Sequence, residues 1–417
     1  MRQTIAEKIL SKHAGRILRA GDLAICKVDF AFGQDGTSSI IIDRIKEFAT
    51  LKLKTQFCMV IDHSAPSPNE GVSKVHKKMR LFAEEMNCLL YDIGCGVCHQ
   101  VIPESGKVLP GDLVLGADSH TCTYGALGVF STGVGSTDLA VALATGKNWF
   151  KVPETIKIII KGKLPKGVFA KDLIIHIIGS IGANGATYKA VEFFGPVIDK
   201  LSIDARMTIC NMVVEMGAKV GFMPQDKKTI SWFKKEAGYI KHINLVIPDK
   251  DARYEKVLEF NINGLVPQVS IPHSVDTVKT ARELKNIRIN QAFLGTCTNG
   301  RLEDLKIAAM ILKGRKVAKG VKLIIAPSSR SVLLKALKLG IIDIFIKSGA
   351  VIVAPGCGPC VGTHNGIPAD QEIVISSANR NFKGRMGNPN AFIYLASPAT
   401  VSASAITGYI TDPKKYL

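Results

Sequence analysis

The chain of 417 residues is long enough for two or three domains with a large buried core. It begins without an apolar signal segment and has no apolar run of membrane-spanning length, so we expect a cytoplasmic protein that does not enter a membrane. The formal net charge of +19 raises nucleic acid as a partner, but the basic residues are mostly spaced lysines without interleaved aromatic residues, which favours a solvated face that attracts an anionic substrate or an acidic partner subunit.

The ten cysteines are distributed over the whole chain. In a cytoplasmic protein such thiols stay reduced, so each is expected either to pack in the core or to bind a metal. We assign four of them to packing, namely Cys26, Cys58, Cys88 and Cys210.

Residues 1–150 predict a first α/β domain. Its expected elements are, in order, an amphipathic helix over 1–20 with Thr4 as N-cap, a strand over 23–28, a turn-rich loop over 32–39, a helix over 39–48, strands over 57–61 and 112–116, and a helix that ends near Trp149 after loops of small residues. The last two strands are short apolar runs of the kind that form buried parallel strands.

An aspartate and a histidine follow each of these two strands, Asp62-His63 directly and Asp118 and His120 after Ala117. Ligands bind at the carboxyl ends of strands in open α/β sheets, so side chains at this position are candidates for a functional site. An aspartate or histidine in a loop is more often an ordinary hydrogen-bonding group, but the recurrence of the pair favours function. The candidates are Asp62, His63, Asp118 and His120.

The segment Cys95-Gly-Val-Cys98-His99 has the C-x-x-C-H pattern of c-type haem attachment. We reject that interpretation because haem attachment requires export. A thioredoxin-like dithiol is also weakly supported, since that motif opens a helix in a small domain. We expect His99 to be functional and the two cysteines to pack.

Residues 151–285 predict a second domain, beginning with a strand from Thr155. An apolar helix over 208–218 places Asn211 and Glu215 four residues apart, and therefore on one face. A glutamate on so apolar a helix is costly unless it is paired or coordinating. The alternative is that Glu215 reaches the surface near the end of the helix.

Residues 286–417 predict a third α/β domain in which polar loops follow three strands. The strands over 290–294, 350–354 and 372–376 lead to Cys297, to Cys357 and Cys360, and to the stretch from Asn379 to Arg385. We expect all three loops to lie at the same edge of one sheet. Two arginines in the last loop, Arg380 and Arg385, suit carboxylate recognition, because the guanidinium fork matches two oxygens.

Three thiols in two glycine-rich loops suit an iron–sulfur cluster, because thiolates hold such clusters and glycines let the backbone approach the sulfides. No fourth cysteine accompanies Cys297, Cys357 and Cys360, so one iron would keep an open position suited to Lewis-acid chemistry. The alternatives are that Cys357 and Cys360 form a zinc half-site or a redox dithiol.

Together these loops resemble the aconitase superfamily. The resemblance covers about residues 4–413 and rests on Asp62-His63, Ala117-Asp-Ser-His-Thr-Cys-Thr, Gly295-Thr-Cys-Thr-Asn-Gly-Arg, Gly356-Cys-Gly-Pro-Cys and Asn379-Arg-Asn-Phe-Lys-Gly-Arg. It implies a fold of three α/β domains around one [4Fe–4S] cluster held by Cys297, Cys357 and Cys360. It further implies active-site residues at Asp62, His63, His99, Asp118, His120, Asn211 and Glu215, and substrate contacts at Gln34, Ser119, Asn379, Arg380 and Arg385.

The resemblance also implies a hydro-lyase that isomerises a 2-hydroxy dicarboxylate by removing water and adding it back at the neighbouring carbon. In full-length members a swivelling fourth domain supplies a catalytic base, and we expect this chain to lack that domain. We therefore expect a separate small subunit that carries it, in a heterodimer or heterotetramer. The whole-chain resemblance favours 2-isopropylmalate as substrate over homocitrate, citrate or citramalate. A nucleic-acid-binding iron–sulfur protein is the competing class, supported only by charge.

Overall fold

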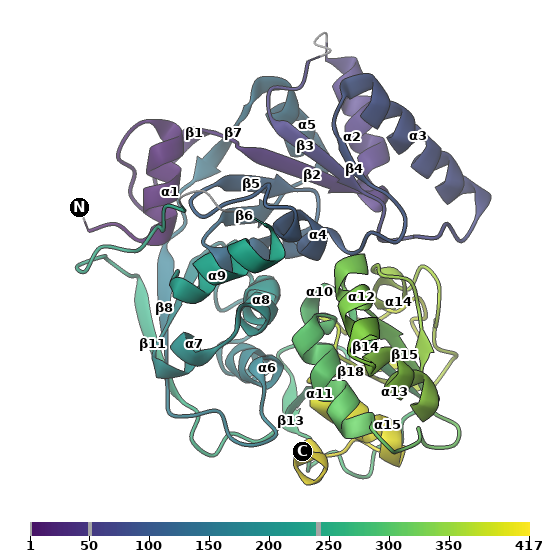
Figure 1. The fold of residues 1–417 in the computed structure, drawn as a ribbon. Helices are drawn as coiled ribbons and strands as arrows, with labels where there is room; N and C mark the ends of the chain where they lie inside the picture. Colours follow the sequence, from purple (N-terminus) through teal and green to yellow (C-terminus); the bar gives the residue numbers. More distant parts are fainter. Residues whose placement is uncertain (1, 49–51, 239–242) are drawn as a thin grey trace.

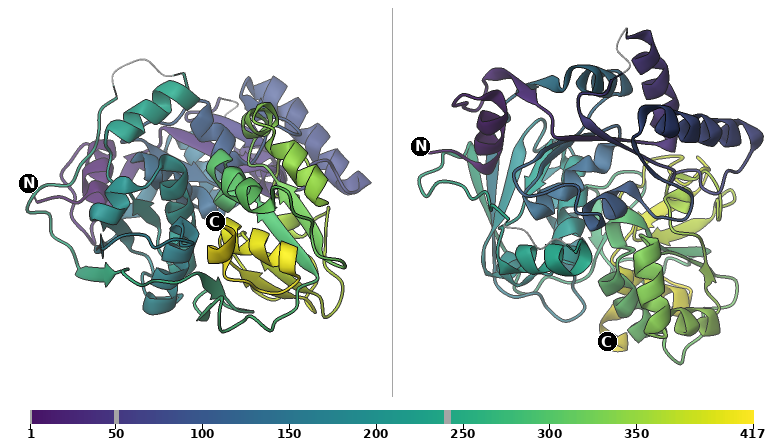
Figure 2. Two further views of the ribbon diagram at one scale, coloured as in Figure 1. Left: turned by 60° about the horizontal axis from the view of Figure 1, so that its bottom comes forward. Right: turned by 45° about the horizontal axis from the view of Figure 1, so that its top comes forward.

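The computed structural model describes residues 2–48, 52–238 and 243–417, which form a mixed α/β fold built on three main sheets. Figure 1 shows the three parts in chain order, with the first at the top, the second at the lower left and the third at the lower right. The two further views in Figure 2 show that the three parts remain packed side by side. Across the described residues, no helix is both long and apolar enough to cross a membrane.

The first sheet has five parallel strands in the order β4-β3-β2-β5-β6. The strands are β2 (Phe30–Gln34), β3 (Gln56–Val60), β4 (Leu89–Tyr91), β5 (Leu113–Gly116) and β6 (Phe130–Gly133). Its helical segments are α2 (Asp35–Glu47), α3 (Glu70–Met86), α4 (Cys98–Glu104), the 3₁₀ helix η1 (Ser119–Leu127) and α5 (Ser136–Thr145). Helix α1 (Ile5–Ala14) and an antiparallel ribbon of β1 (Leu23–Lys27) and β7 (Lys147–Lys151) complete this part.

The second sheet has four parallel strands in the order β10-β9-β8-β11. The strands are β8 (Thr155–Lys161), β9 (Ala190–Phe194), β10 (Val220–Phe222) and β11 (Lys256–Asn261). The helical segments are α6 (Ala170–Ile181), α7 (Pro196–Lys200), α8 (Ile203–Met212), the 3₁₀ turn η2 (Val213–Met216) and α9 (Lys227–Glu236).

The third sheet has seven strands in the order β13-β12-β18-β17-β14-β15-β16, of which the last five are parallel. The strands are β12 (Gln268–Ser270), β13 (Val278–Thr280), β14 (Gln291–Gly295), β15 (Lys322–Ala326), β16 (Val351–Ile352), β17 (Ile373–Ser376) and β18 (Phe392–Leu395). The helical segments are α10 (Thr296–Asn299), α11 (Leu302–Leu312), α12 (Arg330–Lys338), α13 (Ile341–Ser348), α14 (Gly358–Val361), α15 (Pro398–Thr407) and the 3₁₀ turn η3 (Pro413–Tyr416).

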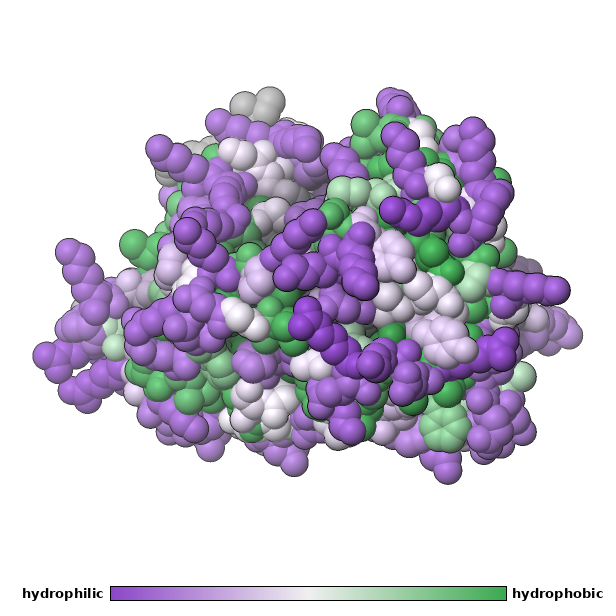
Figure 3. Space-filling view, turned by 90° about the horizontal axis from the view of Figure 1, so that it is seen from below, coloured by the Kyte–Doolittle hydropathy of each residue, from purple (hydrophilic) through white to green (hydrophobic). Residues whose placement is uncertain are grey.

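One large hydrophobic cluster joins the three parts, because it contains buried residues from all three sheets and their helices. A second cluster lies mainly beneath the first sheet and a third beneath the third sheet. On the face seen from below, hydrophilic side chains cover most of the surface and hydrophobic ones form small separate patches (Figure 3). This surface agrees with the expected solvated face.

Several predicted elements differ from the observed ones. The loop expected over 32–39 is instead the end of β2 and the first turns of α2, and the helix expected over 1–20 ends at Ala14, where Gly15 has a left-handed φ of 68°. The first of the loops of small residues expected after His120 is instead the 3₁₀ helix η1, and a Cβ on Gly125 within it would collide with the carbonyl oxygen of Gly221. The stretch near Trp149 is strand β7, and the apolar helix around Asn211 begins earlier and passes into η2 after Met212.

Candidate active site

The predicted site residues come from the carboxyl ends of parallel strands in two sheets and from the helical segments α4, α8 and η2. Strands β2, β3 and β5 lead to Gln34, to Asp62 and His63, and to Asp118, Ser119 and His120. Strands β14, β16 and β17 lead to Cys297, to Cys357 and Cys360, and to Asn379, Arg380 and Arg385. His99 lies in the first turn of α4, Asn211 at the end of α8 and Glu215 in η2. The edges of the first and third sheets therefore face one another across α8.

Twelve of the fifteen predicted residues line one cavity of about 210 Å³. They are Gln34, His63, His99, Asp118, Ser119, His120, Cys297, Cys357, Cys360, Asn379, Arg380 and Arg385, joined by Val361. The other three lie outside the lining, and each makes a hydrogen bond to a lining residue: Asp62 to His63, Asn211 to Cys297 and Glu215 to His120. A wider hollow of about 530 Å³ shares Gln34, Asp118 and Ser119 with the cavity and so adjoins it.

Two histidines and two aspartates form a chain at one side of the cavity. His63 Nδ1 lies 2.7 Å from Oδ1 of the fully buried Asp62, and His63 Nε2 lies 3.3 Å from Asp118 Oδ2. Asp118 Oδ1 is 2.8 Å from His99 Nε2. Burial opposes charge on both groups, but the negative charges of Cys357 and Asp62 raise the pKa of His63 well above its usual range, and the two histidines hold the pKa of Asp118 well below its own. His63 is thus placed as a proton donor beside an ionised carboxylate.

On the opposite side, Glu215 joins a histidine to an arginine. Glu215 Oε1 accepts from His120 Nε2 at 2.9 Å, and Arg380 Nε lies 2.8 and 3.0 Å from the two carboxylate oxygens. Burial lowers the pKa of His120 to about 4, with the charge of Arg380 acting in the same direction. The pKa of Glu215 is lowered by His120 and Arg380 although burial opposes this. A neutral imidazole, an ionised carboxylate and a guanidinium result, and the predicted alternative in which Glu215 reaches the surface is wrong.

Hydrogen bonds tie the cysteine loops to the histidine loop of the first sheet. The backbone N–H of Cys357 donates to the Asp62 carbonyl at 2.6 Å, and Thr363 Oγ1 donates to the His63 carbonyl at 2.8 Å. This close approach requires glycine at position 356, because a Cβ there would lie 2.8 Å from the Asp62 carbonyl oxygen. The positions of Cys357 and His63 are therefore set together.

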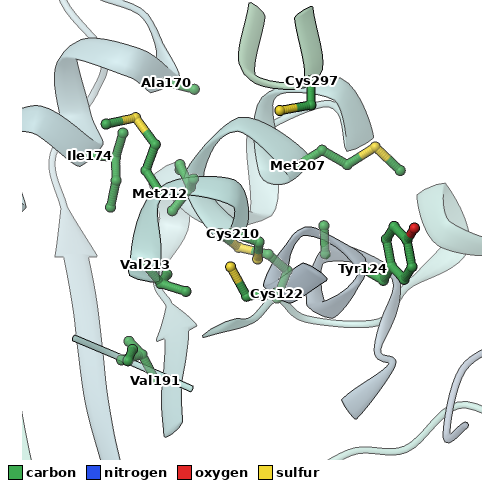
Figure 4. Packing of buried hydrophobic residues seen from close by; sticks show 14 of the residues in the cluster. Cys122, Tyr124, Ala170, Ile174, Val191, Met207, Cys210, Met212, Val213 and Cys297 are labelled. Atoms are coloured by element: carbon green, nitrogen blue, oxygen red, sulfur yellow. The ribbon is translucent and has the colours of Figure 1, made fainter. Parts of the chain in front are cut away.

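Polar side chains donate to two of the three sulfurs. Asn211 Nδ2 lies 3.3 Å and Asn379 Nδ2 3.6 Å from Cys297 Sγ, and Arg385 Nη2 lies 3.3 Å from Cys360 Sγ. All three cysteines are buried, with 2 to 5% of their surface exposed. Figure 4 shows Cys297 above α8, with Met207 beside it and Cys122 and Cys210 deeper in the packed core. Donors aimed at sulfur suit thiolates that carry negative charge.

The distances between the three cysteine sulfurs distinguish an iron–sulfur cluster from a single zinc ion as the group that the site could hold. Thiolates on one tetrahedral zinc lie about 3.8 Å apart, given a Zn–S distance of roughly 2.3 Å. Within the described residues, Cys297, Cys357 and Cys360 do not form a group whose sulfurs all lie within 4.8 Å of one another. Asp62, His63 and Cys357 do form such a group, but Asp62 is already occupied by His63 Nδ1 and the Cys98 N–H. The donor set therefore fits a multinuclear cluster better than one ion.

Two residues that support the site, Asp35 and Lys171, were not assigned to it by the sequence patterns. Asp35, the first residue of α2 directly after β2, accepts from the backbone N–H groups of Asp62, His63 and Ser64 at 3.1, 2.7 and 2.8 Å. Lys171 is fully buried, and its ammonium donates to the carbonyls of Ser377 and Ala378 just before Asn379. The strand-end pattern would have identified Asp35 had β2 been recognised, whereas nothing in the sequence marks Lys171.

The remaining cysteines have packing environments. Cys26, Cys58, Cys98 and Cys210 are buried in hydrophobic clusters, and Cys88 and Cys95 pack partly buried against them. Cys98 opens α4, where its N–H donates to Asp62 at 2.7 Å, so the C-x-x-C-H segment contributes a backbone donor and His99 to the site.

The chain is similar to known proteins in both sequence and fold. A profile of the Aconitase family (aconitate hydratase) matches residues 7–284 and 277–408. The chain is 51% identical to the 3-isopropylmalate dehydratase large subunit of Elusimicrobium minutum, over all of both chains. It is 50% identical to the probable methanogen homoaconitase large subunit of Methanosarcina mazei, over 94% of this chain and all of that one. Among solved structures, Thermococcus kodakaraensis aconitase X in its holo form shares the fold, with a TM-score of 0.51, 14% identity and 92% coverage of each chain.

Proposed function

The chain belongs to the aconitase family, and from that premise we propose that it is the large subunit of a cytoplasmic hydro-lyase that interconverts 2-isopropylmalate and 3-isopropylmalate in leucine biosynthesis. The observation that carries the proposal is the cavity in which three cysteines meet three histidines, Asp118 and two arginines. Full-length relatives from Elusimicrobium minutum and Thermotoga maritima, 51 and 50% identical, are named 3-isopropylmalate dehydratase large subunits, which supports the choice of reaction. Ten cysteines without a disulfide suit a reducing compartment.

Cys297, Cys357 and Cys360 would hold one [4Fe–4S] cluster per subunit. When bound, the cluster supplies an iron with an open position that polarises a hydroxyl on the reacting carbon. Asn211, Asn379 and Arg385 would stabilise the thiolates through the N–H···S contacts described above.

The surrounding side chains bind the substrate and move one proton. Arg380 would hold a substrate carboxylate while Glu215 fixes its guanidinium. His63 Nε2 would protonate the departing hydroxyl, because Asp62 holds Nδ1 and fixes the ring. The proton on the neighbouring carbon would leave to a base on the small subunit. Rehydration reverses these transfers with the hydroxyl on the other carbon.

Recognition of the side group would lie largely with the partner. The lining of the cavity is polar apart from Val361 and the cysteines, so this chain recognises the hydroxyl and carboxylates that all the candidate acids share. An isopropyl group requires an apolar wall, whereas the extra carboxylate of homocitrate requires a cation. Homoaconitase is the second candidate function, favoured by the relative from Methanosarcina mazei.

The cluster is tested by metal content and colour after anaerobic purification. We expect a brown protein with close to four irons, and loss of colour in Cys297→Ser, Cys357→Ser and Cys360→Ser. Cys95→Ala is the matched control and should stay brown, since Cys95 lies outside the cavity lining. Zinc without iron after reconstitution would refute the cluster.

The reaction is tested by reconstitution with the small subunit. The isolated chain should be nearly inactive, and a partner of about 150–200 residues should restore turnover. kcat/KM for isopropylmalate should exceed that for homocitrate, citrate and citramalate. A preference of tenfold or more for a tricarboxylate, about 1.4 kcal/mol, would favour homoaconitase and leave the cluster chemistry intact.

A further inference from the structure

A second hollow, of about 680 Å³, lies outside the candidate active site and shares no lining residue with its cavity. Helix α4 of the first part, α8 and α9 of the second, and α11 and α12 of the third surround it. Figure 1 shows α8 and α9 facing α11 and α12 across the middle of the molecule, with α4 above them. We call this hollow the α9–α11 pocket.

The floor of the α9–α11 pocket contains a buried arginine with an unused donor. Arg301 is fully buried, and its Nε and Nη1 donate to Gln100 Oε1 at 2.9 Å and to the Thr298 carbonyl at 3.0 Å. Its Nη2 has no partner in the part of the chain that the structure describes. A buried N–H without an acceptor is costly, so the floor is suited to a ligand that brings one. Asp204 and Glu303 lie beside it, and burial raises the pKa of each.

The wall is apolar and the rim is basic. Ile203, Leu302 and the half-buried Trp232 form the wall, and Trp232 is held edge-on against the buried Phe233 with ring centroids 5.4 Å apart. On the rim, the exposed Lys200, Lys227 and Lys306 have neither a hydrogen bond nor an ion pair among the described residues. The charged lining thus combines four acidic groups, Glu104, Asp204, Glu236 and Glu303, and the unpaired donor of Arg301 with three lysines that make no hydrogen bond or ion pair among the described residues.

The geometry points to a binding site for a nucleoside polyphosphate in the α9–α11 pocket, independent of the proposed function. A base inserted along Trp232 has ring acceptors for Arg301 Nη2 and amino donors for Asp204 and Glu303. The phosphates then reach Lys200, Lys227 and Lys306 at the rim. A free amino acid would leave most of the hollow unfilled, and inorganic phosphate would not use the apolar wall.

Arg301, on the floor of the α9–α11 pocket, also contacts the segments that carry two residues of the candidate active site. Gln100 follows His99 in α4, and Arg301 holds the Thr298 carbonyl next to Cys297. A ligand that bonds Arg301 would therefore act on the loop that carries Cys297 and on the helix that carries His99. This contact makes the site suited to regulate the cavity without entering it.

The test uses the full chain with Trp149→Phe, which leaves Trp232 as its one tryptophan, since the sequence has two. ATP should quench Trp232 fluorescence saturably, with a dissociation constant below about 1 mM at low salt. Adenosine and inorganic pyrophosphate should each bind at least tenfold more weakly. In the same background, Lys227→Glu and Lys306→Glu should each weaken ATP binding about tenfold, and Lys338→Glu, at the exposed end of α12 and outside the pocket, should not.

Three results would overturn the inference. The first is the absence of saturable quenching by ATP. The second is equal weakening by Lys338→Glu, which would indicate attraction to the general surface charge. The third is pyrophosphate binding as tight as that of ATP, which would reduce the pocket to an anion patch without a base site.

Discussion

Glu192 in β9 should make this protein less stable as pH rises, and Glu192→Gln should remove that dependence. The carboxylate is fully buried and accepts from the Ile5 N–H at 2.6 Å and from the Tyr254 hydroxyl at 2.8 Å. Burial raises its pKa from 4.5 to about 7, with the hydrogen bonds opposing the shift. Between these two values the folded state binds more protons than the unfolded state, so the free energy of unfolding falls as pH rises through the window.

The magnitude follows from the size of the shift. A pKa rise from 4.5 to about 7 corresponds to about 3 kcal/mol, lost progressively from pH 4.5 and fully absent above pH 7. Glutamine keeps an acceptor for the Ile5 N–H and places an amide against the Tyr254 hydroxyl, so it retains the contacts without the charge. The variant should differ from the wild type by less than about 1 kcal/mol at pH 5 and exceed its stability by up to about 3 kcal/mol at pH 8.5.

Urea unfolding followed by circular dichroism at pH 5, 6, 7 and 8.5 measures this difference. Subtracting the wild-type curve cancels other titrating groups, among them Asp172 and Asp304, whose pKa values burial raises to about 7. Glu259→Gln is the matched control, because Glu259 is half exposed in a surface pair with Lys161 and should change stability by less than about 1 kcal/mol. A difference for Glu192→Gln that stays constant with pH would refute the reasoning.

Three further predictions concern the candidate active site, measured in the reconstituted two-subunit enzyme. Asp62→Asn turns an amide donor toward either the Cys98 N–H or His63 Nδ1, so it should lower stability by about 1–3 kcal/mol and kcat at least tenfold; unchanged kcat would contradict the assignment of His63. Arg380 Nε alone contacts both oxygens of Glu215, which leaves the two terminal nitrogens of the guanidinium for a substrate carboxylate; Arg380→Lys has one nitrogen for both tasks and should lower kcat/KM by about 10- to 100-fold, mainly through KM, whereas an effect on kcat alone would argue against carboxylate binding. Asn379→Ala removes a donor to Cys297 Sγ, so the brown colour should remain while the reduction potential of the cluster becomes more negative, and an unchanged potential would show that this contact is absent in the loaded protein.

The strand-end pattern predicted much of this site because it depends on local sequence. An apolar run followed by a polar pair identifies both a buried strand and its carboxyl end, which is why Asp62, His63, Asp118 and His120 were predicted. The same pattern at Asp35 was obscured by Gly33, which resembles a turn residue. In the structure Gly33 lies within β2, and a Cβ there would lie 2.8 Å from the side-chain ends of Ile41 and Ser38, which would have to shift. Tertiary packing, not turn formation, explains that glycine.

Contacts between parts distant in sequence could not be predicted in this way. Lys171 and the carbonyl of Ser377 lie 206 residues apart in the chain, and Asp62 and Cys357 meet through backbone groups that carry no sequence signal. The family resemblance predicted which residues share the cavity, but not that Asp62, Asn211 and Glu215 stand behind its lining. The extents of the three predicted domains likewise stay predictions.

The positive net charge and the acidic character of the site have one physical explanation. Several acidic residues are buried or nearly buried, where Asp35, Asp62, Asp118 and Glu215 pair with histidines, an arginine or backbone N–H groups. Many of the lysines lie on the surface, because a solvated ammonium costs little while a buried one must find carbonyls, as Lys171 does. Among the described residues, six acidic side chains are buried against three lysines and arginines, so the positive excess lies on the surface. A field of this sign draws dianionic acids toward the cavity and favours a partner subunit with an acidic face, without requiring nucleic acid.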